Sequence, residues 1–442
     1  MKKEDFVEKT HKAISADKDK LERLKNLDCL VFDSSLREST VGQVRGHTLS
    51  NKFEIYDEAQ RCGFDRFIVA AFSDAARVDD SFLQALAKDN KVTDKMYTFS
   101  EVPMDKENVP AGLTKMKTYG IRNPIFEIDL ANAAIFEGDQ AISIEVFCDY
   151  LKHWISWSHN NLLGGSGGQD VLVNIRDFPF AMSSHPDRVF AVISSLASAG
   201  SLKPGGMIYE EPTGEYSPSV MGEWTAAIRE CMNGEGWKDG HLLVHVHQKW
   251  GFAQPVQLEC LASGANGIWA GLSDEGAALG HAGSAITLTN LWRLGNKKIL
   301  KSYNCDALRS AAFNVAKITT GFPPEPKHPV YGSRALDLAF DFGGIAGGTD
   351  DNTFALAKLF GTTPPVRIST LASDNLIVQR LEQVFGEDDQ FTLDIAAKMH
   401  ALIIGDLVGN QKKEYMSAKS LADLFERAGG SITDKMRGVI NE

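Results

Sequence analysis

Two histidines within one apolar segment give the strongest chemical signal in this sequence. The segment at residues 241–247 reads HLLVHVH, which places His245 and His247 two residues apart. If the segment forms a strand, both side chains point to the same face of its sheet. Two imidazoles on one face can ligate a single metal ion of the zinc or iron type. The alternative is a pair of hydrogen-bonded histidines that binds no metal.

A second signal is the dipeptide Arg37-Glu38, which follows a short apolar run at residues 29–33. The planar Arg37 cation can bind a substrate carboxylate or an enolate oxygen. The Glu38 carboxylate can join two imidazoles around a metal ion and still leave coordination positions open, as Lewis-acid catalysis requires. An isolated Arg-Glu dipeptide is also typical of a solvated surface ion pair.

These residues lie far apart in the sequence, so a fold must bring them together. The alternation of predicted strands and helices indicates which fold this is. Apolar runs of strand type alternate with amphipathic helical patterns, and the runs span residues 29–33, 64–73, 96–102, 124–130, 170–178, 205–212, 241–247 and 264–272. Eight such runs predict an α/β fold of the (β/α)8 TIM-barrel type. A doubly wound open sheet has a similar rhythm, but no G-x-G-x-x-G motif follows the first strand, which disfavours its dinucleotide-binding form.

We expect three regions along the 442 residues. Residues 1–27 are predicted to form an N-terminal helical extension, residues 28–320 the catalytic barrel, and residues 321–442 a mainly helical C-terminal region. The proline-dense segment at 321–329 marks the second boundary. A barrel takes roughly 250 residues, so the length accommodates one barrel and a smaller region.

The barrel predicts where further site residues lie, because active sites occupy the C-terminal ends of the strands and the loops that follow. We therefore expect His281 and Glu211 to be candidates for proton transfer, and Gln43 and Asp177 to contact substrate. Glu210 and Glu211 end the same predicted strand, so strand alternation directs one of them inward and the other outward.

Composition excludes several classes of partner. The net charge of −12 argues against nucleic acid and membrane surfaces, because binding to either needs basic patches. The six cysteines form no C-x-x-C pair, so we expect neither a zinc knuckle nor a disulfide framework, and a reducing, cytoplasmic compartment. No apolar run approaches the length of a membrane span, and the charged N-terminal segment is unlike a targeting peptide.

Several segments together resemble the DRE-TIM metallolyases, the superfamily of isopropylmalate synthase, homocitrate synthase and HMG-CoA lyase. FDSSLRE at residues 32–38, followed by Gln43, resembles the first-strand signature, in which homocitrate synthases carry Arg-Glu and most relatives Arg-Asp. HVHQKWGFA at 245–253 looks like the H-x-H-N-x-x-G segment of that family. YEEPTGEYSP at 209–218 looks like its A-D-T-x-G-x-x-x-P segment, and residues 261–285 look like its eighth strand and Gly-rich loop.

The resemblance implies a function and a site. Glu38, His245 and His247 would hold a divalent ion of Zn, Mn, Mg or Fe, and Arg37 would stabilise an enolate or bind a 2-oxo group. The implied reaction is condensation of an acyl-CoA with a 2-oxo acid, or carbon–carbon cleavage of the HMG-CoA lyase or aldolase type. We expect a homodimer, with the C-terminal region as the candidate for its contacts.

The sequence also departs from that family. Val69 stands where most members carry a second-strand Glu, Ser284 where they carry the Asn of an A-G-N loop, and Leu338 where the synthases carry a catalytic His. Arg176-Asp177 replaces the usual Glu-Asp of the fifth strand. These changes favour a different substrate, a lyase direction or lost activity, and they leave Ser284 as a candidate for substrate contact.

Two other classes remain open on the sequence. Two His and one carboxylate also form the facial triad of non-haem iron oxygenases, although that triad normally sits on an antiparallel fold, which the α/β rhythm disfavours. A catalytically silent barrel would keep the metal or ligand site and serve a regulatory or assembly role.

Overall fold

The structure is a computed structural model, and the residues that it describes are 3–38, 47–71, 77–164, 171–276, 279–339, 349–409 and 411–441. Contacts divide the chain into two compact units, residues 1–324 and 325–442. The first contains all of the strands named below, and the second is mainly helical.

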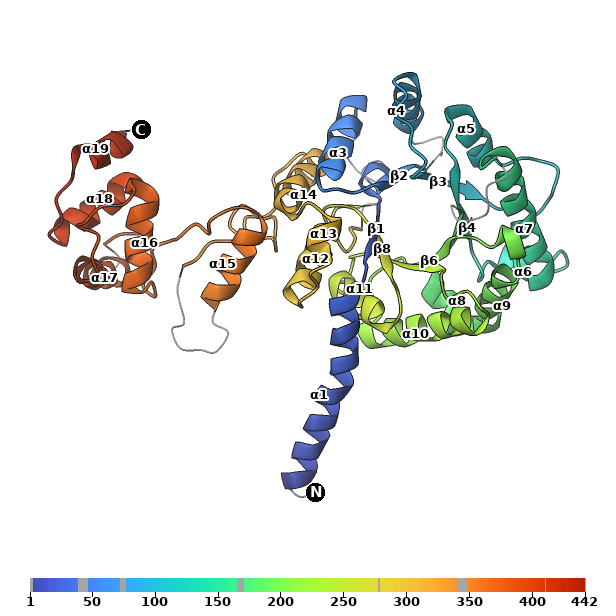
Figure 1. The fold of residues 1–442 in the computed structure, drawn as a ribbon, viewed down its shortest axis with the longest axis horizontal. Helices are drawn as coiled ribbons and strands as arrows, with labels where there is room; N and C mark the ends of the chain where they lie inside the picture. Colours follow the sequence, from blue (N-terminus) through green and yellow to red (C-terminus); the bar gives the residue numbers. More distant parts are fainter. Residues whose placement is uncertain are drawn as a thin grey trace. The chain divides into compact units, whose positions relative to one another are not determined.

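The first unit is a closed barrel of eight parallel strands in sequential order (Figure 1). The strands are β1 (Leu30–Asp33), β2 (Arg66–Ala70), β3 (Met96–Glu101), β4 (Asn123–Ile128), β5 (Leu172–Ile175), β6 (Gly206–Glu211), β7 (His241–Val246) and β8 (Gly267–Ala270). Strand β8 pairs with β1, which closes the sheet. Each strand lies within one of the apolar runs or starts one residue before it, so the predicted barrel class is confirmed.

Helices connect the strands and lie around them, as α3, α4, α5, α7, α9 and α10 show in Figure 1. Their bounds are α1 (Lys3–Asn26), α2 (Ser35–Glu38), α3 (Leu49–Arg61), α4 (Arg77–Lys88), α5 (Ala111–Tyr119), α6 (Ala133–Phe136), α7 (Ile144–Asn161), α8 (Phe178–Ser184), α9 (Pro186–Ala197), α10 (Pro218–Gly234), α11 (Ala253–Ser263), α12 (Ser284–Arg293), α13 (Ile299–Ser302) and α14 (Cys305–Thr320). Local sequence features determine where several of these helices begin or end. Thr48 and Asn51 form a capping box at the start of α3, and Gly321, with φ of 83°, ends α14 in the left-handed conformation.

One apolar layer fills the barrel, and every strand contributes to it. Its buried members are Phe32, Ile68, Tyr97, Phe99, Ile125, Leu172, Ile208, Leu243 and Trp269. Because side chains alternate along a strand, the residue two positions after each of these also points inward, one step nearer the C-terminal mouth. This strand phase, meaning which alternate residues of a strand point inward, decides which polar side chains reach the mouth.

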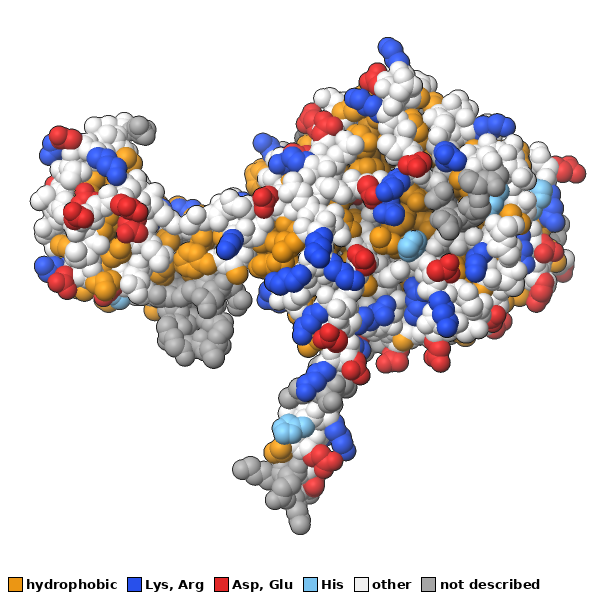
Figure 2. All heavy atoms as spheres, viewed as in Figure 1, with side chains coloured by type: hydrophobic (Ala, Val, Ile, Leu, Met, Phe, Trp, Pro, Cys, Tyr) orange, Lys and Arg blue, Asp and Glu red, His pale blue; other side chains and the backbone are white. Residues whose placement is uncertain are grey.

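Charge is spread over the barrel unit. On the face that Figure 2 shows, Lys and Arg side chains are intermingled with Asp and Glu over the described residues of this unit. None of the described helices is both long and apolar enough to cross a bilayer.

The second unit consists of helices packed around their own core. The helices are α15 (Thr349–Leu359), α16 (Asp374–Phe385), α17 (Leu393–Val408), α18 (Ala418–Arg427) and α19 (Asp434–Asn441). Leu376, Leu381, Ile403 and Leu421 are among the core residues that α16, α17 and α18 contribute. This unit confirms the expected helical character of the C-terminal region.

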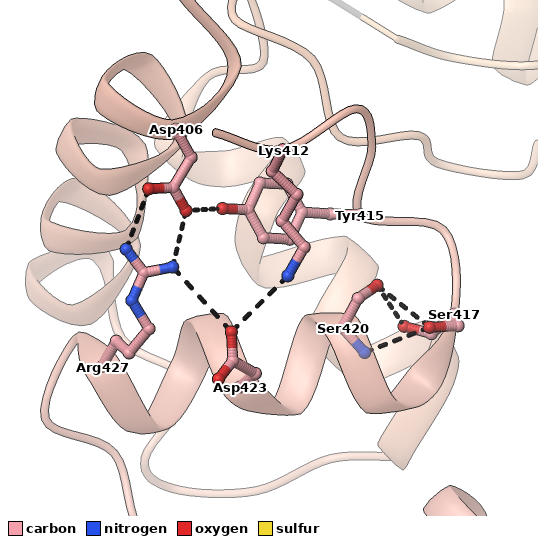
Figure 3. A network of polar contacts seen from close by, with 7 residues as sticks. All are labelled: Asp406, Lys412, Tyr415, Ser417, Ser420, Asp423 and Arg427. Carbon is pink, nitrogen blue, oxygen red and sulfur yellow. Dashed lines mark hydrogen bonds and ion pairs between the residues drawn. The ribbon is translucent and has the colours of Figure 1, made fainter. Parts of the chain in front are cut away.

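A polar clasp joins α17 to α18 in this unit (Figure 3). The Arg427 guanidinium donates to both Asp406 oxygens, with Nη2 3.0 Å from Oδ1, and the buried Tyr415 hydroxyl donates to Oδ2 of the same carboxylate. Lys412 and Arg427 also lie near Asp423, at 3.5 and 3.8 Å. The bonds from Arg427 and then Tyr415 hold the pKa of Asp406 at about 2.

We predict that Asp406→Asn destabilises the C-terminal unit by about 2 kcal/mol at pH 7, because it removes charge-assisted hydrogen bonds. The pKa of Asp406 is depressed in the folded state, so its contribution is present above its usual value and is lost as pH falls toward 2. Urea unfolding and amide exchange in α17 and α18 measure the loss. Asp423→Asn, which removes a more exposed carboxylate, is the control and should have a smaller effect; equal stability of Asp406→Asn and the parent at pH 7 would contradict the clasp.

Candidate metal centre

Strand β7 directs two histidines into the mouth of the barrel. Leu243 belongs to the inner apolar layer, so His245 and His247 follow on the same face of the strand. The two ring centroids are 4.8 Å apart, and the two residues are 0% and 5% exposed. The prediction that HVH presents both imidazoles together agrees with this placement.

A third histidine joins them from the loop after β8. The backbone of His281 bridges to His247 in an antiparallel sense, and its N–H donates to Asp274 O at 2.8 Å. The His281 ring centroid lies 4.7 Å from that of His245 and 4.3 Å from that of His247. One ligand nitrogen from each of the three rings lies within 4.8 Å of the others. His281, expected as a loop residue over the mouth, therefore lies within the histidine cluster itself.

The loop is shaped to bring the His281 ring inward. A Cβ atom at Gly276 would lie 1.9 Å from His281 Nδ1, so only glycine allows this close approach. Gly280, with φ of 74°, makes the turn that precedes the histidine.

The three rings have the chemistry of metal ligands. Burial, then the neighbouring imidazoles and Arg37, lowers the pKa of His245 well below its usual value, and burial followed by His247 and Arg37 does the same for His281. Neutral imidazole is the form that binds metals. Both ring nitrogens of His245 and Nδ1 of His247 are buried without a hydrogen-bond partner among the described residues. An unsatisfied buried polar atom costs about 1–3 kcal/mol, and a bound cation would remove that cost, so these residues fit a divalent metal ion.

A carboxylate faces the same cluster from β6. Glu210 Oε1 lies 3.3 Å from His247 Nε2, and Oε2 lies 4.0 Å from His245 Nδ1. Asn174 Nδ2, on β5, donates to Oε2 at 3.2 Å. Burial raises the pKa of Glu210, but the bond and charge of His247, the Arg37 charge and Asn174 outweigh burial and lower it overall. The carboxylate is therefore held ionised toward the histidines.

Glu211, the sequence candidate for proton transfer, faces the other way. Its buried carboxylate accepts from the Thr213 N–H at 3.2 Å, from the Thr213 hydroxyl at 3.0 Å and from the Gly214 N–H. Burial raises its pKa, and these bonds oppose the shift. Strand alternation thus assigns Glu210 to the mouth and Glu211 to ordering the loop after β6.

Arg37 reaches the mouth over an aromatic surface. Its guanidinium carbon lies 4.9 Å from the Phe99 ring centroid and 5.6 Å from that of Trp269. Trp269 stacks in turn on His245, with centroids 4.4 Å apart and planes 22° apart. Cation–π contact of this kind favours holding a guanidinium over the aromatic rings. Nothing in the sequence pattern pointed to this role for Trp269.

A fully buried ion pair fixes the short helix that carries Arg37. Lys52 Nζ on α3 lies 2.8 Å from Asp79 Oδ1, with side-chain exposures of 0% and 1%, and also donates to Leu36 O in α2. The Ala71 N–H donates to the other Asp79 oxygen at 3.2 Å. Lys52 therefore ties α2 to α3 and to the start of α4.

The remaining predicted residues have varied positions. Ser284 begins α12, fully buried, and its hydroxyl has no hydrogen-bond partner among the described residues. Asp177 lies just after β5 with φ of 46°, and burial, then Asp129 and Glu210, raises its pKa. Gln43 and the side chain of Glu38 lie outside the described residues, so the structure brings together only the two histidines of the predicted metal set.

Two family departures are visible in the fold. Val69 in β2 is fully buried and offers no titratable group. Leu338 is 3% exposed, belongs to the core of the C-terminal unit and bridges to Val366. It is a packing residue at the position where the synthases carry His.

Comparison with known proteins supports the fold but not a closer kinship. No family model and no curated protein sequence matches the chain. Among solved structures, HMG-CoA lyase from Pseudomonas aeruginosa is similar with a TM-score of 0.53 and 14% identity, over 71% of this chain and 98% of that one. HMG-CoA lyase from Brucella melitensis is similar with a TM-score of 0.51 and 14% identity, over 67% of this chain and 100% of that one. An HMG-CoA lyase from Acinetobacter baumannii, solved with coenzyme A and 3-methylmalate, has a TM-score of 0.52 and 12% identity, over 70% of this chain and 98% of that one.

These likenesses show that the chain has the fold of HMG-CoA lyases. The barrel fold that the resemblance of the short motifs implies is thus confirmed. At such identities the likeness concerns architecture, and the chemistry has to be argued from the residues at the mouth.

We predict that Lys52→Met destabilises the barrel by about 3–5 kcal/mol, because it leaves Asp79 buried without its cation. The double variant Lys52→Met/Asp79→Leu should be less destabilised than the sum of the two single changes, since the charges leave together. Urea unfolding of the full chain measures both effects. A cost for Lys52→Met below 1 kcal/mol would show that the pair does not hold α2.

Proposed function

We propose that the barrel is a divalent-metal-dependent enzyme that breaks or forms a carbon–carbon bond next to a carbonyl group. The observation that carries the proposal is the convergence of three buried imidazoles and the Glu210 carboxylate near Arg37 at the C-terminal mouth of the barrel. This is the end at which barrel enzymes place their chemistry.

The residues of the site would have separate roles in metal binding and substrate binding. His245, His247 and His281 would hold the ion, which supplies a Lewis acid for a substrate carbonyl oxygen. Arg37 would bind a substrate carboxylate or stabilise an enolate oxygen through its planar donors, preorganised by Phe99 and Trp269. Ser284 and Asp177 remain candidates for substrate contact, and Glu211 for ordering the loop beside it.

The substrate class follows from the same groups. A cation and a guanidinium together suit a molecule with a carbonyl and an adjacent carboxylate or thioester, such as a 2-oxo acid or a hydroxyacyl-CoA. Cleavage is our first candidate, because Leu338 is a core residue where the synthases carry a catalytic His. Condensation of an acyl-CoA with a 2-oxo acid is the second, favoured by the helical unit that follows the barrel.

We predict that the purified protein, stripped with chelator and reloaded, binds one divalent ion per chain. His245→Ala and His281→Ala should each weaken binding by at least about 100-fold, since loss of outer-shell partners alone costs 10–100-fold. His241→Ala is the matched control, because this histidine begins the same strand and lies outside the cluster. Plasma mass spectrometry and calorimetry give stoichiometry and affinity; a wild-type protein that binds no more metal than the two variants would end the proposal.

We predict that Arg37→Met lowers kcat by about 10²–10³-fold at unchanged metal stoichiometry, because a preorganised donor for developing charge is lost. Arg37→Lys should recover only part of the rate, since it keeps the charge without the planar fork. Steady-state assays with 2-oxo acids and hydroxyacyl thioesters, with and without chelator, test this. Turnover that survives both chelator and Arg37→Met would contradict the assigned roles.

A further inference from the structure

The geometry points to Glu210 as the carboxylate ligand of the metal, so that the ion is held by His245, His247, His281 and Glu210. This inference rests on the proposed function and changes its ligand set. The sequence resemblance assigned the carboxylate to Glu38 and gave no third imidazole. Glu210 was left open there, as one of two neighbouring acids of unknown direction.

The strand phase supports this ligand set. Ile208 lies in the inner apolar layer, so Glu210 points into the barrel from β6 as His245 does from β7. The two residues are also register partners on adjacent strands. A carboxylate and an imidazole thus start from neighbouring positions at the same height in the barrel.

The shorter of the two separations from Glu210 to the imidazoles matches the spacing of neighbouring metal ligands, and both are longer than in a strong ion pair. Charge-assisted N–H···O bonds are about 2.7–2.9 Å long, whereas Glu210 Oε1 and His247 Nε2 are 3.3 Å apart and Oε2 and His245 Nδ1 are 4.0 Å apart. Metal bonds of about 2.0–2.1 Å at tetrahedral angles put neighbouring ligand atoms about 3.3 Å apart. The carboxylate also approaches two different rings, one with each oxygen, so it borders the space between them.

The surroundings of Glu210 are those of a ligand carboxylate. Asn174 donates to Oε2 at 3.2 Å and so fixes its orientation, as outer hydrogen bonds do around metal-binding carboxylates. The Glu210 side chain is only 15% exposed. Three imidazoles with a single carboxylate suit Mn²⁺, Fe²⁺, Co²⁺ or Zn²⁺ better than Mg²⁺, which prefers oxygen ligands.

Cobalt binding to the full-length protein tests this inference, because the visible spectrum of Co²⁺ reports its ligands. Glu210→Gln should weaken Co²⁺ affinity by at least about 10–100-fold and shift the absorption bands. Glu38→Gln is compared directly, and Glu101→Gln, which neutralises an exposed carboxylate at the end of β3, is the matched control and should bind as the wild type does. Thermal unfolding of the metal-free proteins checks that each variant folds.

Each outcome decides the inference. Loss of affinity with shifted bands in Glu210→Gln supports direct ligation, whether or not Glu38→Gln also weakens binding. Unchanged bands with weaker binding would make Glu210 an outer partner of His247 and overturn the inference, as would wild-type affinity in Glu210→Gln. In both of these cases the wild type still binds metal, so the proposed function stands; a wild-type protein that binds no Co²⁺, Zn²⁺ or Mn²⁺ contradicts the function as well.

Discussion

The phase of the strands in a closed parallel barrel is the constraint on which the site depends. Once Ile125, Leu172, Ile208 and Leu243 face inward, the residues two places later must face inward too. Those residues are Glu127, Asn174, Glu210 and His245, which form a polar tier directly above the apolar one. A slip of one residue in β6 or β7 would turn Glu210 or His245 outward. The barrel closure from β8 to β1 then brings Trp269 and Arg37 against this tier.

Burial of this polar tier sets the protonation state of its histidines and also lowers the stability of the fold. The same enclosure that keeps His245 and His281 neutral, by lowering the pKa of each, leaves ring nitrogens of His245 and His247 without a hydrogen-bond partner in the described part of the chain. A fold optimised only for stability would fill this space with apolar side chains, since buried unsatisfied polar groups weaken a protein. Their presence, with Arg37 stacked on two aromatic rings nearby, is a local violation of packing rules of the kind that marks functional sites.

The sequence predicted the parts of this arrangement that depend on local pattern. Eight apolar runs separated by helical patterns define the barrel, and the spacing of His245 and His247 places both rings on one face whatever the exact strand ends. Choosing between Glu210 and Glu211 required the phase of β6, which a run of apolar residues with no polar alternation does not reveal. His281 reaches the cluster because Gly276 and Gly280 allow its loop to fold back on β7, and the conformation of a loop follows from tertiary contacts. The Lys52–Asp79 pair gave no signal, because its members are 27 residues apart on two helices that are otherwise amphipathic surface elements.

The ligand set bears on whether the barrel turns over substrate. Four protein ligands complete a tetrahedral zinc site, and a closed site of that kind is structural. An ion held by three imidazoles and Glu210 would need a fifth or sixth position for substrate, which Mn²⁺, Fe²⁺ and Co²⁺ provide more readily than Zn²⁺. Val69 and Leu338 are buried apolar residues that offer no titratable group, while His281 and Glu210 would add ligands to the two imidazoles of β7. If this ligand set is correct, an ion of higher coordination number would leave a position for substrate, whereas zinc bound by all four side chains would stabilise the barrel without catalysing a reaction.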